Sequence, residues 1–319
     1  MITALMPAHN AARFISEAID SIQSQTLQDW ELIIVDDHSE DDTVAIASAY
    51  AAEDPRIKLI ACRGTGIADA RNAALEIAQY DICAVTDADD VFVPDRFERQ
   101  AALFEAEPDV VACGGAFQTM DAQGTDLKLI TPSPLPQSRL GSLPVIIPHL
   151  PTPTVAFRRA VVMQMGCYRS VFRIVEDIDL LLRLEEVGRM VNLDSVLCRY
   201  RLHEQSSSSS KNAQQAEFFV FAVGLALQRR RTGEDGCLTG ARCLEDLDLP
   251  NEDMERLTHQ KTISRLNSRN RQRTPWSKED IAAFDRLVPV LKECAPNWIE
   301  ILSRERVKHM DAPGPGMPS

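Results

Sequence analysis

Short apolar runs and amphipathic stretches alternate along the chain up to residue 113. The apolar runs have the length of buried strands and lie at 2–6, 32–35, 57–61, 82–85 and 110–113. The stretches between them repeat apolar residues at helical spacing and lie at 11–25, 39–52, 67–79 and 94–107. This alternation predicts an α/β fold with a Rossmann-like, mostly parallel sheet and helices on both of its faces.

Beyond residue 204 the pattern changes to helices without strands. Residues 206–210 are a run of serines, which is typical of a flexible boundary. Helical patterns follow at 213–232, 251–266, 277–294 and 296–307. We therefore expect an α/β domain at 1–210, an α-helical C-terminal region at 211–310 and a disordered, Pro- and Gly-rich tail at 311–319.

Polar residues gather after three of the predicted strands. Residues 36–37 follow the second strand, residues 64–71 follow the third, and residues 87–90 follow the fourth. Because ligands of open α/β sheets bind at the carboxyl ends of the strands, these segments predict a polar crevice. Ser39 is a suitable N-cap for the helix that follows the second strand.

The acidic cluster after the fourth strand is the strongest chemical signal. Asp87 and Asp89 are two residues apart, so in an extended segment both carboxylates point the same way and can share a cation. Oxygen ligands of this kind select Mg²⁺ or Mn²⁺, which in a cleft usually neutralise phosphate oxygens. The alternative is a solvated turn, in which Asp90 caps the next helix.

Composition excludes several other functions. A formal net charge of −13 argues against nucleic acid as the main partner. Eight cysteines without a C-x-x-C pair indicate neither a zinc site nor a disulfide framework, which favours a reduced, cytoplasmic protein. The chain starts as a strand without a basic leader, so we expect no secretory signal. Neither G-x-x-x-x-G-K-[ST] nor a G-x-G-x-x-G after the first strand is present, which argues against a P-loop kinase or a dinucleotide dehydrogenase.

Several segments, in order and in register, resemble the successive signatures of family 2 glycosyltransferases of GT-A fold. They are M-P-A-H-N at 6–10, V-D-D-H-S-E-D-D-T at 35–43, A-R-N-A at 70–73, D-A-D-D at 87–90, P-D-R at 94–96, V-E-D-I-D-L at 175–180 and R-Y-R-L-H-E at 199–204. The resemblance covers about residues 1–210. It implies an inverting glycosyltransferase that moves a sugar from a nucleotide-sugar, usually a UDP-sugar, to an acceptor hydroxyl.

The resemblance also implies where the donor nucleotide binds. Pro7, Ala8 and Asn10 would form the loop that holds the base and ribose together with the acidic pair after the second strand. Asp37 would accept from the uracil N–H, and Asp36 would support the same loop. From the residues alone, this pair can equally be turn and capping residues.

Four further residues complete the implied donor and metal site. Arg71 stands where a guanidinium suits a diphosphate or a buried acid, a surface arginine being the alternative. The family uses Mn²⁺ or Mg²⁺, with Asp89 as a direct ligand and Asp87 as a second ligand or a ribose contact. His203 is placed where a neutral imidazole can bind Mn²⁺, although a lone histidine is more often a hydrogen-bonded surface residue.

The implied general base is Asp177, at the start of a predicted helix that stops at Gly188. There the helix dipole favours an ionised carboxylate, which can take the acceptor's hydroxyl proton as its oxygen attacks the anomeric carbon. One such in-line displacement inverts that carbon. The alternative is that Glu176 and Asp177 only cap the helix.

The acceptor is expected to be a saccharide, a lipid-linked molecule or another hydroxyl compound, as in cell-surface polysaccharide or glycoconjugate synthesis. The Pro-rich segment 131–153, with Arg158 and Arg159, is the expected specificity region. Residues 229–231 are three arginines that either contact an anionic membrane, at its inner face, or complement their helix C-terminus. A nucleotidyltransferase and a non-catalytic nucleotide-sugar-binding protein remain the alternative functions.

Overall fold

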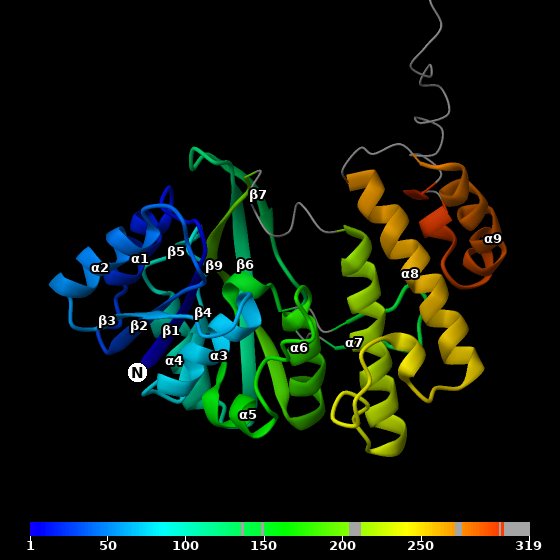
Figure 1. Cartoon of the computed structure of the whole chain (residues 1–319), viewed down its shortest axis with the longest axis horizontal. Coiled ribbons are helices and arrows are strands. Elements are labelled where there is room, and N and C mark those ends of the chain that lie inside the picture. The colour runs from blue at the N-terminus through cyan, green and yellow to red at the C-terminus, as the bar shows by residue number, and fades with distance from the viewer. Residues whose placement is uncertain (135–136, 148–149, 204–211, 272–275, 300, 303–319) are drawn as a thin grey trace, which may run out of the picture. The chain divides into compact units, whose positions relative to one another are not determined.

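The computed structural model describes residues 1–134, 137–147, 150–203, 212–271, 276–299 and 301–302. The chain forms two compact units, and these are Met1–Gln137 with Ile147–Ser206, and Ser138–Ile146 with Ser207–Ser319. The first unit contains the sheet and the second is helical (Figure 1). The boundary predicted at residue 210 and the tail predicted at 311–319 lie outside the described residues.

Strands and helices alternate in the first unit, as the apolar pattern predicts. The strands are β1 (Ile2–Ala8), β2 (Trp30–Asp36), β3 (Ile57–Ala61), β4 (Ile82–Val85), β5 (Val91–Phe92), β6 (Val110–Met120), β7 (Asp126–Ile130), β8 (Ala156–Arg158) and β9 (Arg189–Arg201). The helices are α1 (Ile15–Gln23), α2 (Thr43–Glu53), α3 (Ile67–Ile77), α4 (Arg96–Ala106), α5 (Arg159–Gln164) and α6 (Glu176–Val187).

In the described part of the chain the strands form one nine-stranded sheet with the order β3-β2-β1-β4-β8-β6-β9-β5, and β7 pairs with β6. The strands β1 to β4 are parallel, and β6 is parallel to β9. The short strand β8 lies between β4 and β6 and is antiparallel to both. The predicted α/β class is confirmed, with antiparallel strands added to the parallel half.

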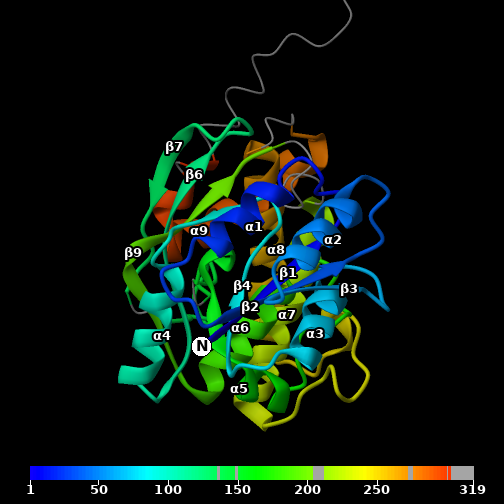
Figure 2. The same ribbon diagram turned by 90° about the vertical axis from the view of Figure 1, so that its left-hand side faces the viewer.

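Helices cover both faces of this sheet (Figure 1 and Figure 2), because the buried strands are apolar on both sides. One core packs α1, α2 and α4 against alternate strand residues such as Leu32 and Ile34. The other packs α3, α5 and α6 against the intervening residues, such as Ile33 and Val35. Because successive side chains of a strand point to opposite faces of the sheet, each strand contributes alternate residues to the two cores.

The helix after β2 begins later than predicted. Its N-cap is Asp42, not Ser39, and the helix starts at Thr43. The hydroxyl of Ser39 instead accepts the backbone N–H of Asn10 at 3.0 Å. The expectation for Ser39 is wrong because a loop-to-loop hydrogen bond uses the oxygen that would have capped the helix.

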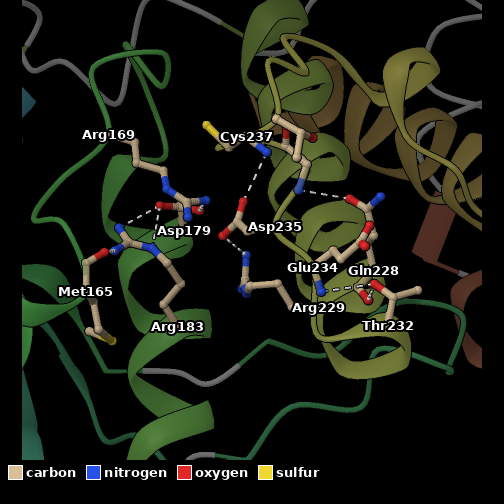
Figure 3. Close-up of polar contacts among 12 residues, drawn as sticks. Met165, Arg169, Asp179, Arg183, Gln228, Arg229, Thr232, Glu234, Asp235 and Cys237 are labelled. Atoms are coloured by element: carbon tan, nitrogen blue, oxygen red, sulfur yellow. Dashed lines mark hydrogen bonds and ion pairs between the residues drawn. The ribbon is translucent and has the colours of Figure 1, made fainter.

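The second unit contains α7 (Asn212–Thr232), α8 (Asn251–Arg271) and α9 (Lys278–Cys294). The helical pattern predicted at 277–294 is found as α9, whose N-cap is Ser277, and the side chain of Ser277 accepts the N–H of Asp280. At the end of α7, Arg229 pairs with Asp235 (Figure 3) and Arg231 pairs with Asp253. Among the described residues, no helix has both the length and the apolar composition to cross a membrane.

Candidate active site

The carboxyl ends of three neighbouring strands are level with one another. Ala8 of β1 pairs with Asp36 of β2, which in turn pairs with Ala61 of β3. On the other side of β1, Leu5 pairs with Val85, the last residue of β4. The loops that follow these strands therefore gather at one edge of the sheet, which is where the sequence predicted a ligand crevice.

The loops after β1 and β2 are joined by short hydrogen bonds. The N–H of Asp37 donates to the carbonyl of Ala8 at 2.8 Å, so the end of β1 positions the acidic pair through its backbone. Asn10 lies in the left-handed region at φ 49°, which asparagine tolerates, and its side-chain oxygen accepts the N–H of Glu40 at 2.8 Å. The carboxylate of Asp36 accepts the N–H of Ser39 at 3.3 Å.

Asp37 carries an acceptor oxygen with no partner. Its Oδ2 accepts the N–H of Gly66 at 2.8 Å. Its Oδ1 is buried and, among the residues that the structure describes, has no hydrogen bond. A buried carboxylate oxygen without a donor costs free energy, and a ligand N–H would satisfy it. The predicted contact with a nucleotide base would supply such a donor.

Arg71 is buried, with 1% of its side chain exposed. Its Nη1 donates to Glu176 at 2.8 Å and its Nη2 donates to Asp87 at 3.1 Å. The alternative of a surface arginine is therefore wrong. Arg71 was also predicted to bind either a diphosphate or a buried acid. Its contact with the buried Glu176 fits the second of these predictions. The guanidinium links the loop after β4 to the first turn of α6.

Glu176 is a site residue that the sequence suggested only as a helix cap. It is 6% exposed. Burial, and then the neighbouring Asp177, raise the pKa of Glu176 to about 7 in spite of Arg71. Sequence position offered one signal, because Glu176 directly precedes the expected base.

Asp89 and His203 lie together, with Nε2 of the imidazole 2.8 Å from Oδ2 of the carboxylate. The His203 ring also packs on Phe14, with ring centroids 4.8 Å apart. Burial and the nearby charge of Asp87 raise the pKa of Asp89. The structure thus places Asp89 and His203, two of the three residues predicted to hold a metal, in contact with each other.

Asp90 is fully buried and is not a helix cap. Its Oδ1 accepts the N–H of Arg201 at 2.8 Å, and the Nε of Arg201 donates to the carbonyl of Asp89 at 2.8 Å. The end of β9 therefore fixes the acid loop, which we define as residues 87–90. Burial, followed by repulsion from Asp89, raises the pKa of Asp90.

The acid loop fits a hard divalent cation in its chemistry. Two carboxylates and an imidazole suit Mn²⁺ or Mg²⁺, and a cation would offset the repulsion between Asp87 and Asp89. Within the described ranges there is no preformed group of three or more His, Cys, Asp or Glu side chains arranged as metal ligands. A Mg²⁺-like ion commonly takes one or two carboxylates and completes its shell with phosphate oxygens and water, so donor binding would complete the site.

Asp177 lies in the first turn of α6, two residues after a strained residue. Val175 has φ 68°, a left-handed conformation that is unfavourable for a β-branched side chain. One carboxylate oxygen of Asp177 accepts the N–H of Ile178 at 2.8 Å, and the other bonds the hydroxyl of Thr152. A small pocket contains Asp177 and is otherwise lined by Val85, Thr152, Val155, Tyr168, Leu180 and Leu181.

Packing behind Asp177 holds α6 in place. Asp179, one turn into the helix, is fully buried and pairs with Arg169 at 3.1 Å and with Arg183 at 2.7 Å (Figure 3). Arg183 also donates to the carbonyls of Met165 and Cys167. The segment before α6 and the helix itself are thereby joined, and Asp177 projects from a rigid element.

The two arginines after the Pro-rich segment do not reach the crevice. Arg158 pairs with Ile82 at the start of β4, and its Nε donates to the carbonyl of Val110 at 2.9 Å. The Nε of Arg159 donates to the carbonyl of Leu75 at 2.7 Å. Both lie towards the opposite edge of the sheet from the acid loop, so their predicted role in acceptor specificity is wrong.

Two solved structures that contain bound nucleotide-sugars share this fold. S. aureus TarS 1-349 in complex with UDP-GlcNAc has a TM-score of 0.58 at 14% identity, covering 97% of this chain and 88% of that chain. The mannosyltransferase PcManGT from Pyrobaculum calidifontis, in complex with GDP-Man and Mn²⁺, has a TM-score of 0.56 at 17% identity, covering 98% and 88%. The fold is therefore that of the GT-A glycosyltransferases.

Sequence comparison gives the family. The family described as Glycosyl transferase family 2 matches residues 3–166, just over half of the chain. The chain belongs to this family and is a glycosyltransferase. Among its relatives, the putative glycosyltransferase EpsE of Bacillus subtilis is 34% identical over 231 residues, 71% of this chain and 79% of EpsE. The amylovoran biosynthesis glycosyltransferase AmsE of Erwinia amylovora is 28% identical over 220 residues, 67% and 81%.

Proposed function

We propose that this glycosyltransferase moves a sugar from a nucleotide-sugar to an acceptor hydroxyl with inversion at the anomeric carbon. The observation that carries this proposal is the Arg71 bridge. One buried guanidinium binds both Asp87 of the acid loop and Glu176, the residue before Asp177. One guanidinium therefore links a residue of the proposed donor site to the residue that precedes the proposed base.

Each part of the site has a distinct task in this proposal. Asp37 offers its free oxygen to a base N–H, and a uracil N–H suits it, as in a UDP-sugar. Asp89, Asp87 and His203 would hold Mn²⁺ or Mg²⁺, which supplies positive charge for the departing diphosphate. Arg71, which is occupied by two carboxylates, acts on the donor through Asp87.

Asp177 acts as the general base. Its carboxylate removes the hydroxyl proton of the acceptor while the acceptor oxygen attacks the anomeric carbon and the bond to the diphosphate breaks on the opposite side. The proton ends on Asp177 and the electron pair leaves with the nucleoside diphosphate. Its place beside a mostly apolar pocket favours proton transfer to the carboxylate rather than to bulk water.

Relatives support a role in polysaccharide synthesis. AmsE is named for amylovoran biosynthesis, and WbnJ of Escherichia coli, which is 30% identical over 215 residues, is named for O-antigen biosynthesis. We propose a carbohydrate or lipid-linked carbohydrate acceptor on this basis. Membership of a glycosyltransferase family counts against the nucleotidyltransferase and the non-catalytic binding protein.

The substitution Asp177→Asn tests the proposal. We expect kcat for release of nucleoside diphosphate to fall roughly 10²- to 10⁴-fold, the usual contribution of a general base, with donor affinity retained. UDP-, GDP- and dTDP-sugars are tested with Mn²⁺, with water or an added saccharide as acceptor. Asp109→Asn, at an exposed ion pair with Arg189, is the matched control and should keep the wild-type rate. An Asp177→Asn enzyme as fast as wild type would remove the proposed base.

A further inference from the structure

The proposed base contacts a short segment that no motif singles out. We name Pro151–Val155 the proline strap, and it contains a 3₁₀ turn over Thr152–Thr154. The Oγ1 of Thr152 donates a short hydrogen bond to Oδ2 of Asp177. The other oxygen of Asp177 accepts the N–H of Ile178. Both oxygens are thus engaged, and the plane of the carboxylate is fixed.

Thr152 suits this task by its chemistry. Threonine is β-branched, so its χ1 angle is restricted and its hydroxyl has a defined direction. The flanking Pro151 and Pro153 fix their own φ angles, which limits the motion of the backbone that carries the hydroxyl. Of the residues that line the pocket with Asp177, only Thr152 and Tyr168 have a side-chain hydroxyl.

The side chain of a buried arginine donates hydrogen bonds to the backbone of the proline strap. Arg96 is fully buried, and its Nη1 donates to the carbonyl of Pro153 at 2.9 Å. Its Nη2 donates to Val155 at 3.3 Å and to Val85, the end of β4, at 2.8 Å. The neighbouring Gln100 donates to the carbonyl of Thr154 at 2.8 Å.

This arrangement is costly, because the described hydrogen-bond acceptors of Arg96 are neutral carbonyls and the side chain of Gln100, although its guanidinium also lies over the ring of Phe92. Burial accordingly lowers the pKa of Arg96. A buried cation is tolerated only when its donors are satisfied, and displacement of the strap would leave Nη1 of Arg96 without its acceptor, the carbonyl of Pro153. One guanidinium therefore bonds both the carbonyls of the strap and the end of β4, which leads into the acid loop.

We propose that Thr152 is a positioning residue for the general base, which orients Asp177 for proton removal without touching the donor. The inference rests on the proposed function of Asp177. Loss of the hydroxyl would let the carboxylate rotate about its χ2 angle, away from the line of the acceptor O–H. Misplacement by about 1 Å in a reacting group can lower a rate by about 10²-fold.

Kinetics of Thr152→Val, which keeps the shape and removes the hydroxyl, test this inference. We expect kcat for nucleoside diphosphate release, with whichever UDP-, GDP- or dTDP-sugar the wild type turns over with Mn²⁺, to fall roughly 10- to 100-fold. The KM for the donor should stay within about twofold, and Thr152→Ser should restore most of the rate. A purely structural role would not give this separation of kcat from KM with rescue by serine.

Thr26→Val is the matched control, because the Thr26 hydroxyl also donates to a carboxylate, that of Glu98 at 2.7 Å, on an exposed surface. It should leave kcat unchanged. If Thr152→Val is as fast as wild type while Asp177→Asn is slow, the positioning role is wrong and the proposed base stands. If Asp177→Asn is itself fast, the proposed function fails first.

A double-mutant cycle tests the contact without any turnover. We expect the urea midpoints of Thr152→Val, Asp177→Ala and the double variant to be non-additive, since either single change already removes the shared hydrogen bond. The exposed pair Thr26→Val and Glu98→Ala should show a smaller coupling. Additive effects at Thr152 and Asp177 would overturn the proposed contact, even if no nucleotide-sugar is turned over.

Discussion

At the scale of single residues, the guanidinium of Arg71 lies among three acidic residues. Arg71 bonds Asp87 and Glu176 directly, and Asp177 is next in the chain to the second of these. A single positive charge cannot fully compensate three neighbouring carboxylates, of which Glu176 is buried. The uncompensated repulsion affects Glu176. Its burial, together with the charge of Asp177, raises the pKa of Glu176 to about 7.

This raised pKa predicts a pH-dependent stability. The folded state holds a proton on Glu176 at pH values where the unfolded state, with a pKa near 4.5, has lost it. The associated stability is therefore complete below pH 4.5 and is lost as the pH rises towards 7, by at most about 1.4 kcal/mol per pH unit. Glu176→Gln should flatten this part of the profile of unfolding free energy, measured by urea denaturation between pH 5 and pH 8.

The exposed Glu98 provides the control for this experiment. Glu98→Gln removes a carboxylate from the surface of α4 and should leave the wild-type slope in place. A Glu176→Gln profile that parallels the wild type across the same interval would show that Glu176 does not hold its proton in the folded state.

The sequence singled out the acidic residues of the proposed site but not the residues that support them. Asp37, Asp89 and Asp177 occupy family motifs and were named from them. Thr152 and Arg96 bond backbone or carboxylate atoms that are distant in sequence, and nothing in their own residue types predicts such partners. Tertiary packing chooses these contacts, so they became visible only in the structure.

At the scale of elements, isolated apolar runs were predictable and short edge elements were not. The strand predicted at 82–85 is found as β4 because acidic residues bound it on both sides. The three-residue β8 and the two-residue β5 are too short to show any period. The antiparallel strand inside the parallel sheet was missed for this reason.

Gly66 gives the clearest test at this scale. It precedes α3, the helix that carries Arg71, and has φ 95° and ψ 165°, a region that is essentially restricted to glycine. A Cβ would meet no atom within 4 Å, so the cost of Gly66→Ala is in the backbone alone. We expect a loss of about 1–3 kcal/mol in unfolding free energy, measured by urea denaturation.

Gly141→Ala is the matched control for Gly66→Ala. The space around Gly141 is also open, and its φ lies outside the positive region. We expect a change within about 0.5 kcal/mol for this variant. Equal losses for the two substitutions would mean that the left-handed backbone at Gly66 is not under strain.

At the scale of the whole molecule, the α/β class followed from the alternation of patterns, whereas strand order did not. Pairing of β8 between β4 and β6 joins segments that are more than forty residues apart in sequence, and single-sequence periodicity carries no information on such pairs. The predicted role of Arg158 in acceptor specificity was wrong for this reason. Arg158 pairs with Ile82, which lies at the start of β4 and not at its end.

Donor and metal should stabilise the whole glycosyltransferase. At a concentration of a UDP-sugar about 100 times its Kd, with Mn²⁺, we expect about 2.7 kcal/mol of added stability, which corresponds to a rise in Tm of roughly 5–10 °C. Asp89→Asn should lose the part of this rise that depends on Mn²⁺. The readout is a thermal-shift assay with UDP-, GDP- and dTDP-sugars, with and without Mn²⁺.

Asp109→Asn should keep the full thermal shift, since its exposed carboxylate lies outside the crevice. Wild-type protein that none of the three nucleotide-sugars stabilises would contradict the proposed donor class. An Asp89→Asn protein that retains the Mn²⁺-dependent rise would contradict the proposed ligand.

The bond between Asp90 and the backbone of Arg201 spans 111 residues of sequence. During synthesis, the strand that bears the acidic motif leaves the ribosome long before the residue that secures it. A nascent chain that ends before residue 201 therefore has the motif but lacks the hydrogen bond that closes its loop. Such long-range contacts form late and slow folding, so we expect the acid loop of the proposed donor site to be completed only near the end of the folding of the first unit.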